Sequence, residues 1–114
     1  MKPNFYKACH DGDIAMAKRL LRESNVSPSV YHNESIRHSS QNGNTNAVKI
    51  LLTDERVDPS DLNNWAIQQA SYHGHLEVVK LLLKDPRVDP SVEENYAIRW
   101  AAYNNNPKVV RLLL

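Results

Sequence analysis

Histidine and cysteine are the residues in this chain of 114 amino acids that could bind a metal ion or act as a nucleophile. His73 and His75 lie two residues apart, and Cys9 precedes His10. A structural zinc site normally has four Cys or His ligands, and the chain contains one cysteine. A nucleophilic cysteine needs a base that faces it, but adjacent helix positions point in different directions. We therefore expect no metal site and no catalytic residue, with His75 capping a helix and Cys9 buried as a structural thiol.

The glycines of the chain are evenly spaced and do not cluster in one loop. Gly12, Gly43 and Gly74 are separated by two equal steps. A loop that cradles phosphate groups needs several glycines within a few residues. The spacing instead indicates one bend that recurs along the chain, so we expect no cofactor and no enzymatic activity.

Composition and charge narrow the class of protein. Hydrophobic residues make up 41% and charged residues 24% of the chain, which is the balance of a globular protein. The net charge of +1 gives no general attraction to nucleic acid or to an anionic membrane. No N-terminal apolar run resembles a signal peptide, and no segment is apolar enough to span a bilayer. We expect an intracellular, cytoplasmic protein without a membrane or nucleic-acid partner.

The whole chain repeats with the period that separates these glycines, and it needs no insertion or deletion to align with itself. The same offset relates several columns of residues: Val26, Val57 and Val88; Phe5, Ile36, Ile67 and Ile98; Gly12, Gly43, Gly74 and Asn105; and the leucine pairs that begin at Leu20, Leu51, Leu82 and Leu113. A repeating unit of this length cannot bury its apolar face alone, so the units are expected to stack around one continuous, elongated core.

Each unit carries signals for two helices joined at the bend. We expect the first helices to begin near residues 3, 34, 65 and 96, after the N-caps Asn33, Asn64 and Asn95 in the last three units and at Pro3 in the first. Second helices are expected after Asp13, Asn44, His75 and Asn106, of which Asp13, Asn44 and Asn106 are good N-caps. The best second helix turns Leu76, Val79, Leu82 and Leu83 inward and ends before Asp85-Pro86. The linker that follows is predicted to be a short extended turn anchored by Val88.

Residues 70–83, with the sequence Ala-Ser-Tyr-His-Gly-His-Leu-Glu-Val-Val-Lys-Leu-Leu-Leu, resemble the helix–bend–helix core of the ankyrin repeat family. The family's opening Thr-Pro-Leu-His signature is absent, and the period is slightly shorter than the family's usual one of about 33 residues. The resemblance implies an all-α solenoid of helix–turn–helix units. We expect a single ankyrin-repeat domain over residues 1–114, with units at about 3–27, 28–58, 59–89 and 90–114, the last one incomplete and without a cap.

The resemblance also implies where a partner would bind. In the family, the positions after the Ala-Ala pair and the tips of the turns form a concave surface that grips partner proteins. These positions are Tyr31, Gln41, Asn42, Leu62, Gln69, Tyr72, His73, Glu93, Trp100, Tyr103 and Asn104. Aromatic residues supply large contact areas at low entropic cost, so Tyr72, Trp100 and Tyr103 are the expected anchors. The alternative is that these rings pack between units, or that a further unit covers Trp100.

A second candidate surface is basic. One column is cationic in every unit and could contact anionic groups: Lys18, Lys49, Lys80 and Arg111. The alternative is a solvated face that supports solubility, with Glu77 placed to pair with Lys80.

The sequence therefore predicts a scaffold for protein–protein interaction. The alternative is a structural spacer or targeting array in a longer protein, with no ligand of its own. A third possibility is binding of nucleic acid or phosphate along the basic column. The exposed leucines at 112–114 further predict self-association through the C-terminal end.

Overall fold

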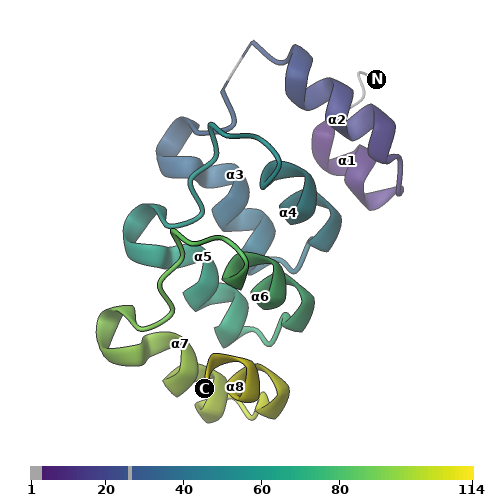
Figure 1. Cartoon of the computed structure of the whole chain (residues 1–114). Helices are drawn as coiled ribbons and strands as arrows, with labels where there is room; N and C mark the ends of the chain where they lie inside the picture. The colour runs from purple at the N-terminus through teal and green to yellow at the C-terminus, as the bar shows by residue number, and fades with distance from the viewer. Residues whose placement is uncertain (1–3, 26) are drawn as a thin grey trace.

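The computed structural model describes residues 4–25 and 27–114, and all regular structure in those ranges is helical (Figure 1). The eight helices there are α1 (Phe5–His10), α2 (Ile14–Glu23), α3 (Val30–Gln41), α4 (Thr45–Leu51), α5 (Asp61–Tyr72), α6 (Leu76–Leu83), α7 (Val92–Tyr103) and α8 (Pro107–Leu113). Short turns join the two helices of each pair, and the all-α prediction is confirmed. Pro3, expected to begin the first helix, and Val26, expected to anchor the first linker, lie outside the described residues.

The helices form two rows. Helices α3, α5 and α7 pack side by side in one row, and α4, α6 and α8 form the second row, with each pair joined across the rows (Figure 1). The molecule is elongated, with extents of 41 × 24 × 21 Å. Ile67, Ala70 and Ser71 on α5 are fully buried between neighbouring helices, and the small side chains of Ala70 and Ser71 let those helices approach closely.

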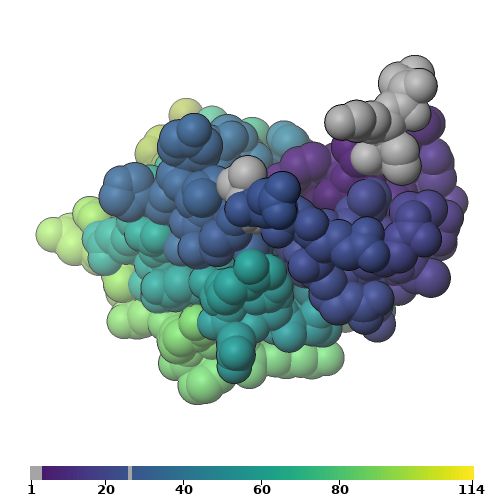
Figure 2. Space-filling model, turned by 90° about the horizontal axis from the view of Figure 1, so that it is seen from above, coloured from purple at the N-terminus to yellow at the C-terminus, as the bar shows by residue number. Residues whose placement is uncertain are grey.

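The N-terminal pair docks differently from the later pairs. Both α1 and α2 pack against α4, and Figure 2 shows these first helices, in purple and dark blue, to one side of the later ones. The side chain of Asn44 caps α4. A hydrogen bond from α4 to the first helix pair comes from the next residue but one, Asn46, whose amide donates to the carbonyl of Cys9 at 3.2 Å.

The buried side chains consequently form two clusters. The prediction of one continuous core is wrong in this respect. The smaller cluster contains Ala8, Cys9, Ala17, Ala47 and Ile50. The larger one contains Ile36, Val48, Leu51, Val57, Ala66, Ile67, Ala70, Val78, Val79, Leu82, Ala101 and Val109. Phe5 and Leu21 touch both clusters.

The bends and second helices follow the sequence prediction. Gly12, Gly43 and Gly74 have φ of 77°, 69° and 73°, and Asn105 has φ of 60°, a left-handed conformation that glycine and asparagine tolerate best. Second helices begin directly after the expected positions, and α6 ends before Asp85. On α6 the inward stripe also includes Val78, which the sequence analysis left out.

Several predicted caps are corrected by the structure. Asp13 and Asn44 do cap α2 and α4 by accepting from Met16 N–H at 3.1 Å and Ala47 N–H at 3.2 Å. His75 and Asn106 make no such cap. Their side chains instead bond the preceding pair: His75 Nε2 lies 2.9 Å from the carbonyl of Gln41, and the Asn106 amide donates to the carbonyl of Tyr72 at 3.3 Å.

Candidate interaction surface

A left-handed turn precedes the right-handed part of α3, α5 and α7. Three consecutive residues in each turn have φ between 52° and 62°, namely Tyr31-His32-Asn33, Leu62-Asn63-Asn64 and Glu93-Glu94-Asn95. L-residues pay about 1–2 kcal/mol each for this conformation, so surrounding contacts must hold it. The right-handed helix then starts at residues 34, 65 and 96, as predicted.

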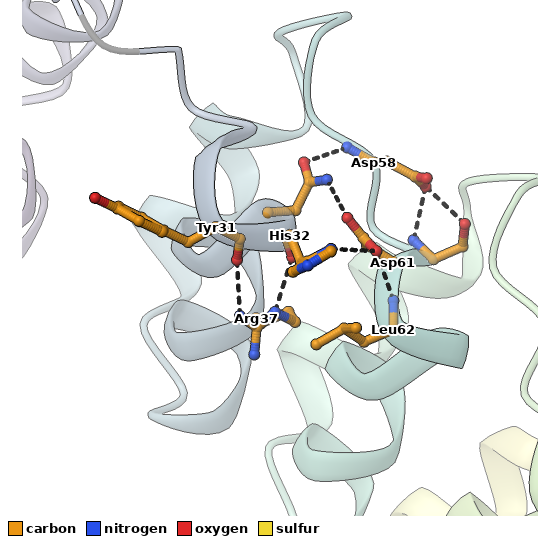
Figure 3. A network of polar contacts seen from close by, with 8 residues as sticks. Tyr31, His32, Arg37, Asp58, Asp61 and Leu62 are labelled. Carbon is orange, nitrogen blue, oxygen red and sulfur yellow. Dashed lines mark hydrogen bonds and ion pairs between the residues drawn. The ribbon is translucent and has the colours of Figure 1, made fainter.

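Side chains from the following helical turn hold each left-handed turn. The guanidinium of Arg37 donates to the carbonyls of His32 at 2.9 Å and Tyr31 at 3.0 Å (Figure 3). Arg99 makes the matching bonds to Glu94 at 2.9 Å and Glu93 at 3.1 Å. In the middle turn the amide of Gln68 donates to the carbonyl of Asn63 at 2.8 Å. The residues that hold the turns are Arg37, Gln68 and Arg99 in the sequence. No rule based on neighbouring residues predicts that their side chains bond to the backbone of the preceding turn.

The side chains of Asn33 and Asn64 bond to the next linker along the chain. The expectation that each of them caps its own helix is wrong. Asn33 Oδ1 accepts from the backbone N–H of Asp58 at 2.8 Å, and Asn33 Nδ2 donates to Asp61 at 2.7 Å. Asn64 Oδ1 accepts from the N–H of Asp89 at 2.8 Å. Asn95, also expected to be a cap, makes none for α7 and is exposed.

Acidic side chains stiffen the same linkers. Asp58 accepts from the N–H of Ser60 at 2.9 Å and from its hydroxyl at 2.6 Å. The Asn33 amide, the Leu62 N–H and the nearby charges of His32 and Arg37 hold the pKa of Asp61 below its usual value. The bidentate pairs of Asp54 with Arg56 and of Asp85 with Arg87 lower the pKa of both aspartates in the same way.

The predicted turn tips lie on the left-handed turns. Tyr31 is 75% exposed and Leu62 is 44% exposed, and Glu93 is also exposed. The Tyr31 ring points away from the polar network, as Figure 3 shows. The held turns therefore present the side chains of Tyr31 and Leu62 to solvent. The carboxylate of Glu93 instead accepts a hydrogen bond from the amide of Asn63 on the neighbouring turn.

The predicted aromatic anchors meet at the C-terminal part of the first row. The Trp100 ring lies 5.6 Å from the Tyr72 ring and 5.1 Å from the Tyr103 ring, centre to centre. Tyr96, which the sequence analysis did not select, lies 5.7 Å from Trp100 at the i,i+4 spacing that could have identified it. We call Tyr72, Tyr96, Trp100 and Tyr103 the aromatic surface.

The four rings differ in exposure. Tyr103 is 78% exposed, whereas Tyr72, Tyr96 and Trp100 are half-buried. Tyr72 and Trp100 come from the neighbouring helices α5 and α7, as the alternative of packing between units predicts, and their role as anchors for a partner stays a prediction. Their rings pack between helix pairs, and the surface that they build still faces solvent.

The remaining predicted partner-binding residues surround this surface or lie further along the row. His73 is exposed and packs edge-on against the Tyr72 ring at 4.9 Å, and Asn104 donates to the carbonyl of Tyr72 at 2.8 Å. Gln69 is half-buried on α5. Gln41 and Asn42 lie at the C-terminal end of α3, away from the Trp100 ring, and the Gln41 carbonyl accepts from His75.

The predicted basic column lies on the second helix of each pair. Lys18, Lys49, Lys80 and Arg111 are all exposed, on α2, α4, α6 and α8. Lys80 pairs with Glu77 at 3.4 Å, as expected.

The described side chains that could bind a metal ion or act as a nucleophile do not form a cluster. In the ranges that the structure describes, no three His, Cys, Asp or Glu side chains are placed to share a metal ion. Cys9 is 1% exposed, and burial raises the pKa of its thiol. Within the same ranges, no helix is long and apolar enough to cross a membrane.

Comparison with known proteins supports the resemblance seen in the sequence. A family model described as ankyrin repeats, three copies, matches residues 5–94 and again residues 36–114. The comparison with curated proteins found no match.

Proposed function

Because this chain belongs to the ankyrin repeat family, whose members are in general non-enzymatic modules for protein–protein interaction, we propose that it binds a partner protein through the aromatic surface and the turn tips. We also propose that residues 1–114 act as one repeat domain, with units at about 3–27, 28–58, 59–89 and 90–114. Each proposed unit contains one helix pair.

The observation that carries this proposal is the exposure of Tyr103 beside Trp100. A tyrosine that is 78% exposed and lies 5.1 Å from a half-buried tryptophan presents a large apolar area that water now covers. Aromatic rings of this kind lose little rotamer entropy on binding, and they dominate interface energetics. The aromatic surface is already ordered by contacts among its own rings, so a partner would not have to order it.

The other predicted contacts extend this surface along the row. The turn tips Tyr31 and Leu62 would contact parts of the partner further from Trp100, while His73 and Asn104 would line its edge. Gln41, Asn42, Gln69 and Glu93 would then supply polar contacts at the rim, where truncation changes affinity little.

The experiment uses the intact chain as bait in an extract of its native cell, in parallel with Tyr103→Ala and Tyr31→Ala. Both rings are largely exposed, so each change should alter the free energy of unfolding by no more than about 0.5 kcal/mol. Loss of a hot-spot aromatic costs about 2 kcal/mol or more, which is a roughly 30-fold loss of affinity for the recovered partner. Tyr6→Ala is the matched control, because Tyr6 is 44% exposed on α1 and outside the aromatic surface.

A fluorescence measurement then localises the contact. The chain has two tryptophans, so a Trp65→Phe variant reports on Trp100 alone. Addition of the recovered partner should shift the emission of Trp100 to shorter wavelength as water leaves the surface. If Tyr103→Ala, Tyr31→Ala and Tyr6→Ala all recover the same partner with equal affinity, the proposed surface is wrong.

A further inference from the structure

A groove on the second row of helices lies between α6 and α8, on a different element row from the aromatic surface. Its volume is about 270 Å³. It is lined by two half-buried leucines and three basic residues, namely Leu76, Lys80, Lys108, Arg111 and Leu112. We call this the α6–α8 groove. It joins apolar contact area to several cationic groups.

The positive charge of the groove is largely uncompensated within the molecule. Lys80 has Glu77 at 3.4 Å, but both groups are about half exposed or more, so solvent screens this pair. In the part of the chain that the structure describes, neither Lys108 nor Arg111 forms an ion pair. Three cationic side chains thus line the groove, and among the described residues only Lys80 has a carboxylate paired with it.

The equivalent groove between α4 and α6 lacks this character. One repeat earlier in the sequence, Leu76 corresponds to Thr45, and Lys108 corresponds to Glu77. The apolar wall is replaced by a hydroxyl, and one cation is replaced by an anion. The α4–α6 groove therefore lacks the combination of an apolar wall and excess positive charge that the α6–α8 groove has.

We propose that the α6–α8 groove binds an acidic peptide segment in which carboxylates flank a leucine-type side chain. The apolar side chain would lie between Leu76 and Leu112. The flanking carboxylates would pair with Lys80, Lys108 and Arg111, of which the guanidinium can form two parallel hydrogen bonds to one carboxylate. Partial removal of these ion pairs from water by the leucines strengthens them.

The shape of the groove favours a peptide over a lipid surface. Proteins that lie on a membrane insert protruding apolar side chains into the acyl boundary. Here Leu76 and Leu112 are half-buried in a shallow groove, so they are placed to contact an apolar side chain and protrude little from the surface.

The test measures fluorescence anisotropy of a short labelled peptide, in which one leucine is flanked by aspartate and glutamate, with the intact chain. We expect saturable binding that Lys108→Glu weakens by about tenfold or more, because the change replaces an attraction with a repulsion. Lys108 is exposed in the first turn of α8, where a carboxylate suits the helix dipole, so the variant should stay folded. Lys49→Glu is the matched control, since it makes the same charge change on α4 and should alter the affinity by no more than about twofold.

A second peptide separates groove binding from general charge attraction. Replacing its leucine by serine should reduce affinity at least fivefold at the same ionic strength, because the apolar contact is lost. Equal weakening by Lys108→Glu and Lys49→Glu, or equal binding of the leucine and serine peptides, would overturn the proposal. So would binding of phosphatidylserine vesicles that depends on Lys108 in the absence of peptide binding. The Tyr103→Ala variant should bind the peptide normally, and loss of binding there would instead place the peptide on the aromatic surface.

Discussion

The side-chain oxygen of Asn33 accepts a hydrogen bond at 2.8 Å from the backbone N–H of Asp58, which is 25 residues further along the chain. Asn64 and Asp89 repeat this relationship at the same distance and the same separation. Both asparagines are at least nine-tenths buried, with 5% and 7% of their surface exposed. Each bond fixes a left-handed turn to the next linker, so it positions the exposed tips Tyr31 and Leu62.

Replacing Asn64 by alanine should destabilise the protein through this bond. The change leaves the Asp89 N–H without its acceptor, which costs about 1–3 kcal/mol, and places alanine at a φ of 62°, which costs about 1–2 kcal/mol. Asn95→Ala is the matched control, because Asn95 has the same φ of 62° but is exposed. Urea denaturation should therefore place Asn64→Ala below Asn95→Ala in unfolding free energy. Equal values would mean that the bond contributes nothing.

The carboxyl group of Asp61 should make stability depend on pH in the acid range. The Asn33 amide lowers its pKa in the folded state, so its contribution is present above the ordinary carboxyl pKa and is lost as pH falls through the lowered value. In Asn33→Ala the donor is missing, and the pKa of Asp61 should rise towards the usual value of an aspartate carboxyl group. An NMR titration of the Asp61 carboxyl carbon measures this directly. An unchanged pKa would assign the shift to the Leu62 N–H and to the charges of His32 and Arg37 instead.

Alanine at Gly43 should cost more stability than alanine at Gly12. Both glycines have a left-handed φ, so each change carries a backbone cost of about 1–2 kcal/mol. A Cβ at Gly43 would lie 2.5 Å from Nδ1 of His75, whereas a Cβ at Gly12 meets no described atom within 4 Å. We expect Gly43→Ala to lose about 1–3 kcal/mol more in thermal or urea unfolding. Adding His75→Ala should recover part of that difference, and failure to do so would show that the ring moves aside freely.

Ser71 should be replaceable by alanine without loss of stability. Its hydroxyl is fully buried and has no hydrogen-bond partner among the described residues, as is also true of Ser40. Removing an unpaired buried hydroxyl should be neutral or stabilise the protein by up to about 1 kcal/mol. The control is Ser60→Ala, which removes a 2.6 Å bond to Asp58 and should destabilise by about 1 kcal/mol. A clear destabilisation by Ser71→Ala would reveal a partner for that hydroxyl.

Much of the fold could be predicted because its signals are local and recur in every unit of the chain. Gly43 and Gly74 mark bends, and Pro107 marks the start of α8. Asp13 and Asn44 act on backbone groups three residues away, so their caps were predictable. The same residue types at Asn33 and Asn106 bond to distant backbone atoms, and there the local rule failed.

Some features of the candidate surfaces could likewise be predicted from the sequence, and others could not. The turn tips and the pairing of Lys80 with Glu77 followed from column and spacing. The α6–α8 groove did not, because Lys108 and Leu112 become its walls only when α8 packs beside α6. Tyr96 differs, because it lies four residues before Trp100 on the same helix, and this local spacing could have identified it.

The sequence by itself determined which residues form helices, where the chain bends and which columns are buried, because these depend on periodicity and on backbone preferences. Only the tertiary structure decided that both helices of the first pair would pack against α4. It also decided that Asn33 and Asn64 would bond to the next linker instead of capping their helices. Packing and hydrogen bonds between residues far apart in the chain decide these features. Such contacts depend on how whole helices are placed, and no local preference encodes that placement.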